Sequence, residues 1–207
     1  MTENRDKLRK LEARIKDCRL CVDSPSGKPL PHDPRPVAWP SAVARICIAG
    51  QAPGLRVHES GIPFDDRSGD RLREWLGVDR DTFYDREKFA IVPMGFCFPG
   101  YDAKGGDLPP RKECAQHWHG DIFEAMPQVE LLLVIGQYAQ AFHLGKLRRK
   151  TLTETVAHWA DIVAETAAPA CLPLPHPSWR NTGWLKRNHW FEAELLPELR
   201  KRVSGLL

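Results

Sequence analysis

Long apolar segments are absent from this chain: no run of about 18 apolar residues occurs, so nothing in it is typical of a membrane-spanning helix. A secretory signal is also absent, because the first ten residues, MTENRDKLRK, are too charged to form one. The net charge is only +3, which many ordinary enzymes carry, so charge alone does not indicate a nucleic-acid partner. We therefore expect a soluble, cytoplasmic protein without a membrane partner.

The length and the apolar content suit one compact unit. With 207 residues, of which 42% are hydrophobic, the chain can bury one substantial core, and no internal repeat divides it. We expect a single domain over residues 1–207 that acts as a monomer. Residues 22–43 contain six prolines, which exclude a helix or a central strand there. This segment is predicted to be an extended covering loop.

The order of short apolar runs and helical patterns predicts the fold class. Apolar runs typical of buried strands lie at residues 44–50, 89–93, 131–136 and 171–174. Helical spacing is found at Leu8, Leu11 and Ile15 and over residues 67–76, 111–126, 137–144 and 188–203. Pro197 should kink or restart the last of these helices. Strands that alternate with helices predict an α/β fold of three layers, α/β/α, with a central four-stranded parallel sheet.

Two loops follow predicted strands and should meet at one site. In such sheets, ligands bind beyond the carboxyl ends of the strands, which is where residues 51–54 and 176–181 lie. Gly50 and Gly54 lack side chains and a proline between them fixes the turn, so the backbone could approach a ligand closely. The same features suit a turn that merely packs, and a histidine before a proline, such as His176, can be purely structural. The residues alone leave both interpretations open.

Cysteines form the clearest cluster of a chemically reactive residue type. The chain has six, and in a reducing cytoplasm a group of them points to metal or redox chemistry rather than to disulfides. Cys47 and Cys171 lie inside apolar runs and are expected to be core residues.

The other four cysteines form two pairs. Cys18 and Cys21 are separated by two residues, a spacing that lets two thiolates hold one metal ion or one corner of a cluster. Cys97 and Cys114 enclose a Gly- and Pro-rich loop, residues 98–112, that a metal would tie at both ends. The spacing does not distinguish zinc from an iron-sulfur cluster, since both accept four cysteines. Four unrelated buried thiols are the remaining alternative.

Three motifs together resemble those of the uracil-DNA glycosylase superfamily. They are Gly50-Gln-Ala-Pro-Gly54, Gly61-Ile-Pro-Phe64 and His176-Pro-Ser178, in the order and spacing of that superfamily. With the Cys-x-x-Cys pair and the two later cysteines, the chain is most similar to the iron-sulfur branch. The resemblance extends from about residue 14 to the end of the last helix. It implies the three-layer fold predicted above.

The resemblance also implies an activity and a cofactor. The activity is hydrolysis of the bond that joins uracil or another deaminated base to deoxyribose, in a nucleotide flipped out of DNA. Phe64 would stack on the base, and His176 would donate a hydrogen bond to the base oxygen as negative charge develops there. Gly50, Gln51, Ala52, Pro53 and Gly54 would hold the base and the attacking water. The four paired cysteines would bind a structural 4Fe-4S cluster, with zinc as the alternative.

The chain departs from the motifs of this branch at two catalytic positions. Gln51 stands where an acid commonly follows the first glycine, and His58 replaces an acid expected before the Gly-x-Pro-Phe segment. The acids Glu59, Asp65 and Asp66 are close in sequence and could substitute. Loss of an acid should slow the reaction without abolishing it, because an oxocarbenium-like transition state needs stabilisation more than a strong nucleophile.

The residues that read the base also depart from the pattern. Related enzymes often have an asparagine after the second strand, and residues 93–97 contain none. The backbone of Gly95 and Phe96 could read the base instead, although Gly95 could equally be a packing glycine. The preferred base, whether uracil, hypoxanthine or xanthine, therefore stays open.

The segment after His176 is predicted to contact DNA. Trp179 or Arg180 would fill the gap that the flipped base leaves. The residues expected to hold phosphates are Ser178, Asn181, Lys186 and Arg187. Trp184 and Trp190 are expected in the core.

Two other functions are compatible with the chain. The missing acids suit a catalytically weak relative that binds lesions or abasic sites without efficient base release. A zinc-stabilised hydrolase of free nucleotides would need a phosphate-binding motif, which the sequence does not contain.

Overall fold

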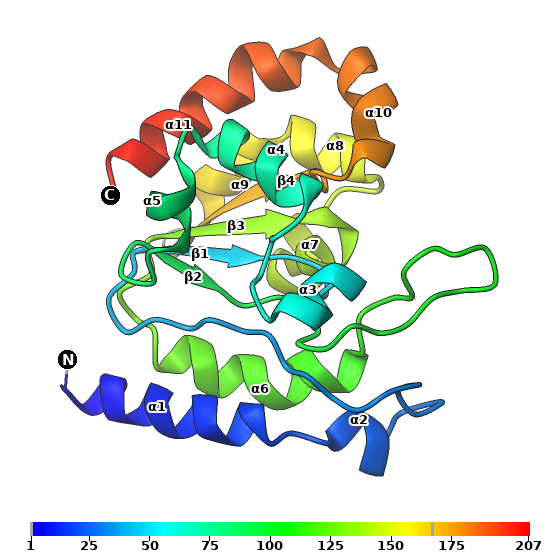
Figure 1. Ribbon diagram of the computed structural model, residues 1–207. Helices are drawn as coiled ribbons and strands as arrows, with labels where there is room; N and C mark the ends of the chain where they lie inside the picture. The colour runs from blue at the N-terminus through cyan, green and yellow to red at the C-terminus, as the bar shows by residue number, and fades with distance from the viewer. Residues whose placement is uncertain (1, 167) are drawn as a thin grey trace.

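A sheet of four parallel strands forms the centre of the molecule (Figure 1). The structure, a computed structural model, describes residues 2–166 and 168–207. The strands are β1 Ile46–Ala49, β2 Phe89–Ile91, β3 Leu131–Ile135 and β4 Ala170–Leu174, in the spatial order β2-β1-β3-β4. Each strand lies at or within one residue of a predicted apolar run. The predicted α/β fold is therefore confirmed.

Alternate residues of each strand enter two separate cores, one on each face of the sheet. Cys47 and Ala49 of β1 pack with helices α1 (Thr2–Lys16) and α6 (Lys112–Glu124). Their neighbours Ile46 and Ile48 pack with α4 (Arg67–Leu76) and α11 (Leu196–Ser204) on the opposite face. This period of two, with both faces buried, produces the predicted three layers (Figure 1).

The long helical patterns correspond to helices, whereas several short helices have no pattern that predicts them. The predicted ones are α1, α4, α6 and α7 (Gly136–His143). The others are α2 (Leu20–Asp23), α3 (Leu55–Ser60), α5 (Arg80–Tyr84), α8 (Leu152–Ala157), α9 (Trp159–Glu165) and α10 (Thr182–Arg187), together with 3₁₀ turns at Gly145–Leu147 and Trp179–Asn181. Helices this short contain too few turns to show an apolar period. None of the described helices combines the length and the apolar character needed to cross a bilayer.

The predicted last helix is divided into two parts. A π-helical turn, Phe191–Leu195, precedes α11, and Pro197 lies in the first turn of α11. Proline lacks an N–H and fits this position best, so the predicted restart is confirmed. Trp184 and Trp190, expected in the core, are only partly buried and pack edge-on against Phe191 at its margin.

The proline-rich segment runs across the outside of the sheet, with one correction to its predicted bounds. It begins after Asp23, because residues 22 and 23 belong to α2. Trp39 forms an antiparallel bridge with Ile91 of the edge strand β2, and the Val37 amide donates to the Phe96 carbonyl at 2.6 Å. The segment therefore covers the edge of β2, next to the carboxyl ends of the strands.

Candidate active site

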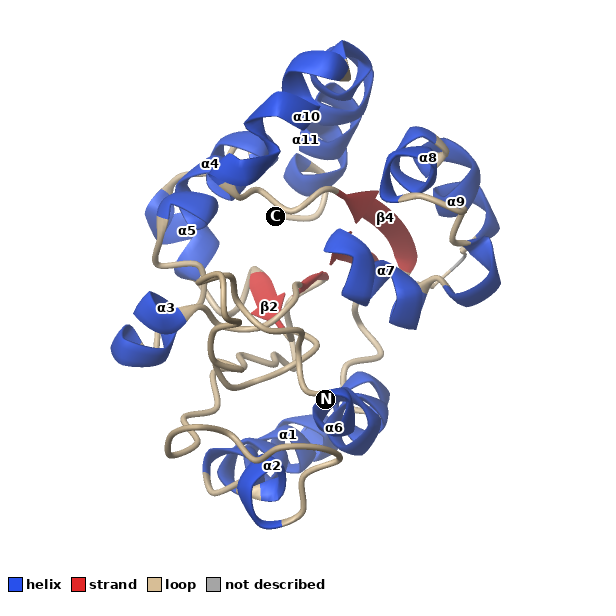
Figure 2. Cartoon of the chain, turned by 90° about the vertical axis from the view of Figure 1, so that its right-hand side faces the viewer, coloured by secondary structure: helices blue, strands red, loops and turns tan. Residues whose placement is uncertain are grey.

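A cavity of about 410 Å³ lies at the carboxyl ends of β1, β2 and β4, the end of the sheet that faces the viewer in Figure 2. Its walls include all of residues 50–54, Phe64 and His176. The two strand-end loops that the sequence placed at one site therefore share one cavity. Its volume lies in the range of small-molecule pockets, about 300–1,000 Å³.

The loop after β1 is held in place by the segment after β2. The Met94 amide donates to the Gly50 carbonyl at 2.9 Å, and the Gly95 amide donates to the Gln51 carbonyl at 3.0 Å. Within the described residues no protein group bonds the Gln51 side-chain amide. Gln51 therefore has a fixed backbone and a side chain that is available to a ligand in the cavity.

Gly95 and Phe96 lie behind the wall of the cavity rather than in it. A Cβ on Gly95 would be 3.2 Å from Pro110, so this residue fills a tight packing position. The Gly95 amide is engaged by Gln51, and the Phe96 amide donates to the Cys114 sulfur at 3.3 Å. The structure thus gives both amides acceptors other than a base, and Gly95 supports the first loop.

The ring of His176 is fixed as a single-donor imidazole. Its Nδ1 lies 3.2 Å from the Ser178 amide, a donor, so Nδ1 accepts and the proton is on Nε2. Burial lowers the pKa of His176 below its usual value, an effect that the Asp66 carboxylate partly offsets. The ring is therefore neutral near pH 7 and presents one N–H donor.

Three side chains hold the His176 loop, and two of them are distant in sequence. Asn181, predicted to bind phosphate, donates from Nδ2 to the His176 carbonyl at 2.8 Å. Arg71 of α4 donates to the Ser178 carbonyl at 3.0 Å, and Gln140 of α7 donates to the Leu174 carbonyl at 3.0 Å. Sequence reasoning missed the roles of Arg71 and Gln140, because no local pattern connects α4 or α7 to this loop.

Phe64 forms a wall of the cavity and is held there by its backbone. Its φ of 55° lies in the left-handed region, which a bulky residue rarely adopts. The Tyr84 hydroxyl donates to the Phe64 carbonyl at 3.0 Å, and a Cβ on Gly69 would lie 1.7 Å from the same carbonyl oxygen. The ring Cζ is 3.3 Å from the position that a Cβ on Gly50 would take. A glycine at residue 50 therefore leaves the space that the aromatic ring occupies.

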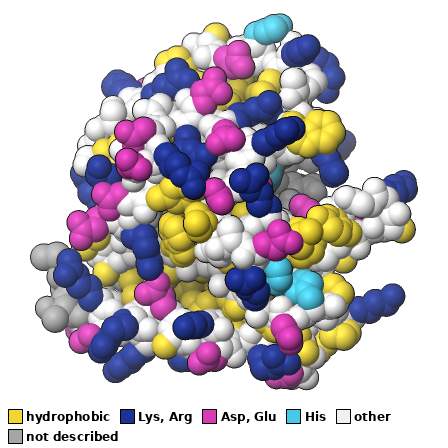
Figure 3. Space-filling view, in the orientation of Figure 1, with side chains coloured by type: hydrophobic (Ala, Val, Ile, Leu, Met, Phe, Trp, Pro, Cys, Tyr) yellow, Lys and Arg dark blue, Asp and Glu magenta, His cyan; other side chains and the backbone are white. Residues whose placement is uncertain are grey.

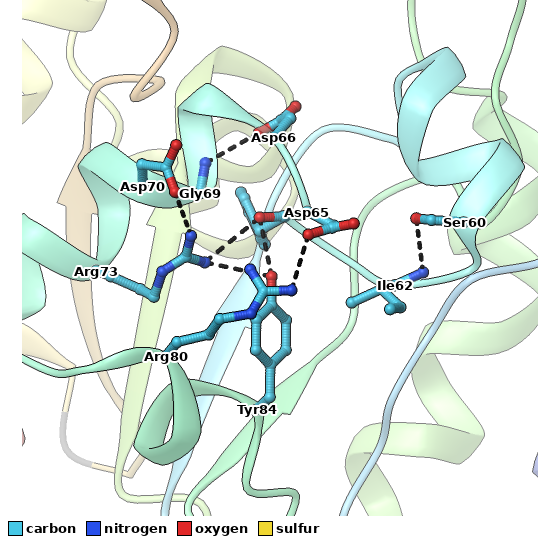
Figure 4. Close-up of polar contacts among 10 residues, drawn as sticks. Ser60, Ile62, Asp65, Asp66, Gly69, Asp70, Arg73, Arg80 and Tyr84 are labelled. Carbon is cyan, nitrogen blue, oxygen red and sulfur yellow. Dashed lines mark hydrogen bonds and ion pairs between the residues drawn. The ribbon is translucent and has the colours of Figure 1, made fainter.

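The structure places the candidate acids Asp66, Asp65 and Glu59 in different surroundings. Asp66 lines the cavity and caps α4, accepting from the Gly69 amide at 2.9 Å (Figure 4). Asp65 is paired with Arg80 at 2.9 Å, and Glu59 is exposed and outside the cavity lining. A fourth acid, Asp107, lines the cavity although sequence reasoning did not select it.

His58, which replaces an expected acid, does not line the cavity. Its ring packs 4.5 Å from that of His32 and 6.1 Å from that of Phe98, measured between centroids. Desolvation, with His32 and Arg35 nearby, lowers the pKa of His58. The residue belongs to the packing of the loop that follows Cys97.

The predicted DNA-contacting residues fall into two groups. Ser178, Trp179 and Arg180 line the cavity, and Trp179 is 66% exposed with the Arg180 guanidinium 5.9 Å from its ring centroid. Lys186 and Arg187 are exposed on α10 and lie outside the cavity lining. On the face that Figure 3 shows, Lys and Arg alternate with Asp and Glu rather than forming one basic patch. An exposed aromatic ring at the cavity mouth is therefore the most distinctive feature of this surface.

The four paired cysteines converge on a second, smaller cavity. Cys18, Cys21, Cys97 and Cys114 all line it, although they come from the segment before α2, from α2, from the loop after β2 and from the first turn of α6. Burial raises the pKa of Cys21 to about 11 and that of Cys97 to about 12. Cys47 and Cys171 lie apart from these four, buried in their strands as predicted.

This second cavity has a volume of about 10 Å³ and is lined by four thiols. Among the described residues, no three His, Cys, Asp or Glu side chains are grouped closely enough to hold a single metal ion. The four thiols nevertheless line one space. The buried indole N–H of Trp118, which also lines the cavity, has no acceptor within the described chain. A sulfur-rich cluster would supply acceptors to such a donor.

Comparison with known protein families agrees with this geometry. The model of the uracil DNA glycosylase superfamily matches residues 39–200, which include the four strands, the loop 50–54, Phe64 and His176. The match covers more than half of the chain, and the chain belongs to the uracil DNA glycosylase superfamily.

Proposed function

We propose that this protein is a monofunctional DNA glycosylase that hydrolyses the N-glycosidic bond of uracil or another deaminated base flipped out of DNA. Membership of the superfamily supports a DNA glycosylase, a hydrolase of DNA repair. The observation that carries the proposal is the single cavity shared by the loop 50–54, Phe64 and His176. We further propose that it works as a monomer in the cytoplasm.

The residues of the cavity suit the separate needs of this reaction. Base extrusion costs a few kcal/mol, which contacts in the pocket must recover. The Phe64 ring offers a stacking surface for the base, and Trp179 at the mouth is suited to fill the gap left in the DNA. Breaking the bond leaves negative charge on the base, and the Nε2–H of His176 is a fixed donor for the base oxygen.

Selection of the base is assigned to the Gln51 side chain. Its amide both donates and accepts hydrogen bonds, and it faces no protein partner among the described residues. The Gly95 and Phe96 amides are engaged elsewhere. An amide that can bond either kind of edge suits several deaminated bases, which all present a carbonyl beside a ring N–H.

We also propose that Cys18, Cys21, Cys97 and Cys114 hold a 4Fe-4S cluster. The shared cavity and the unpaired Trp118 indole support a metal group held by these thiols. The resemblance to the iron-sulfur branch favours a cluster over zinc. The cluster would supply structural cross-linking, joining α2, the loop after β2 and the start of α6. Iron and sulfide analysis, with the visible absorption of anaerobically purified protein, tests it. A colourless protein with one zinc ion per chain would contradict it.

Base release from lesion-containing oligonucleotides tests the activity. The panel contains uracil, hypoxanthine and xanthine, each in single- and double-stranded DNA, with an undamaged oligonucleotide as the control. We expect free base from at least one lesion and none from the control. Tight, salt-dependent binding to a lesion without any release would contradict the proposal and favour a lesion-binding relative.

A further inference from the structure

The loop between Cys97 and Cys114 brings a carboxylate to the active-site cavity. This loop projects from the body of the molecule beside α3 (Figure 1). On its return strand, Asp107 lines the cavity. Asp107 Oδ2 lies 3.8 Å from the position that a Cβ on Gly54 would take, so this oxygen faces the last residue of the loop 50–54. A carboxylate therefore lies beside the loop that lacks an acid at residue 51.

The hairpin around Asp107 is built to hold it. Tyr101 and Asp107 form an antiparallel bridge, and the Leu108 amide donates to the Gly100 carbonyl at 2.9 Å. At the tip, the Asp102 carboxylate accepts from the amides of residues 104 and 106 at 2.8 and 2.9 Å. A side chain that closes its own turn in this way orders the loop locally. The backbone of the hairpin therefore fixes the position of Asp107, and no bond to its carboxylate is needed for this.

Asp107 differs from the other acids near the cavity because its carboxylate has no partner among the described residues. Asp66 already accepts the helix-cap bond from Gly69, and Asp65 is paired with Arg80. No hydrogen bond or ion pair within the described part of the chain holds the Asp107 carboxylate. Its oxygens are available to a water molecule.

The surroundings of Asp107 favour proton acceptance. The residue as a whole is exposed, yet desolvation of its carboxyl raises the pKa above the usual value for aspartate, and Asp66 and Asp102 act in the same direction. Arg180 opposes them. A carboxylate with a raised pKa is a stronger base than an ordinary one.

We propose that Asp107 is a catalytic residue that orients the attacking water and accepts its proton, in place of the acid missing at Gln51. This inference rests on the glycosylase function proposed above. As the bond from C1′ to the base breaks, its electron pair goes to the base, whose oxygen accepts from His176. The water oxygen bonds to C1′ and its proton passes to Asp107. Transfer of that proton to the departed base anion through solvent restores the carboxylate.

Two variants of Asp107 test the proposal under single-turnover conditions, on whichever lesion the parent processes. Asp107→Asn keeps the size of the side chain and removes the base, so base release should slow by about 100-fold or more. Affinity for the same DNA should be unchanged or slightly higher, since a negative charge has been removed from a DNA-facing surface. Asp107→Ala should be equally slow, and added formate should restore part of its rate by occupying the vacated space.

Glu59→Gln is the matched control, because it removes an exposed carboxylate close in sequence but outside the cavity. It should release base at the parental rate. A rate for Asp107→Asn within about threefold of the parent would overturn the assignment and leave the glycosylase function intact. A slow Asp107→Ala that formate does not accelerate, with weakened DNA binding, would also overturn it. A parent that releases no base from any lesion removes the proposed function and this inference together.

Discussion

Replacement of His176 by alanine removes the donor that we assign to the departing base. The Ser178 amide occupies Nδ1, so the imidazole can offer only Nε2–H, and alanine offers nothing in its place. Within the described parts of the chain, the ring makes no other hydrogen bond, and Asn181 bonds the backbone of His176 rather than its ring. The substitution should therefore remove the donor and leave the loop in position.

The size of the effect follows from the number of donors lost. Loss of a single preorganised donor at a developing oxyanion typically costs about 10²–10³-fold in rate, or roughly 3–4 kcal/mol of transition-state stabilisation. We expect His176→Ala to slow base release by that factor and to change DNA affinity little. Because burial lowers the pKa of His176, the parent should keep this donor neutral on the acid side of an ordinary histidine titration. The parental rate should therefore show no inflection at the usual histidine pKa.

Single-turnover base release between pH 5.5 and 8.5 measures both expectations. His189→Ala is the control, because His189 is exposed and lies outside the cavity lining. A His176→Ala rate within about threefold of the parent would refute the assignment of the donor. A parental rate that falls with a pKa near 6.5, together with a flat profile for His176→Ala, would refute the neutral-imidazole argument.

Three further predictions concern packing, the cysteine site and acid stability. Gly50→Ala places a Cβ 3.3 Å from the Phe64 ring, so the ring must shift by a few tenths of an ångström. Base release should fall about 10-fold without a change in the thermal midpoint. An unchanged rate would contradict the stacking role of Phe64. Cys97→Ser should abolish most of the visible absorption and lower the thermal midpoint, and a spectrum like that of the parent would exclude this cysteine as a ligand. Burial lowers the pKa of His119 to about 4 and that of His143 to about 3, so the stability they confer is present above pH 6.5 and is lost as the pH falls. For His119 alone, the free energy of unfolding should fall by about 3 kcal/mol by pH 4, as measured by urea unfolding. The His119→Gln variant should lose correspondingly less stability than the parent between pH 7 and pH 4. An equal loss in both proteins would contradict the argument.

The parts of the fold that depend on local sequence were predictable. Helix α4 was predicted with its observed bounds, because the sequence marks both ends: Asp66 caps the first turn and Gly77, at φ 69°, terminates the last. The strands were predictable because each is a short apolar run buried on both faces. The short helices α8 and α9 were not, since they contain too few turns to show a period and are stabilised by packing on β4.

The cavity was predictable only in part, for a reason of chain topology. Gly50 and His176 both follow strands of one parallel sheet, so the rule that strand ends converge brings them together. Asp107 follows no strand and lies in a loop whose path is set by contacts across the molecule. Its role had no local signal, and Arg71, which supports the His176 loop from α4, had none either.

The path of that loop connects the two sites of the molecule. Its ends, Cys97 and Cys114, line the cysteine cavity, and between them the chain leaves the body, turns at Asp102 and returns Asp107 to the active-site cavity. A group that joins Cys97 to Cys114 therefore fixes both ends of the segment that carries the proposed base. The Phe96 amide, bonded to the Cys114 sulfur, and the Gly95 amide, bonded to the Gln51 carbonyl, make a second connection that is only two residues long. Cys97 and Cys114 are thus connected through the backbone to the loop 50–54 and to the segment that carries Asp107, although none of the four cysteines lines the active-site cavity.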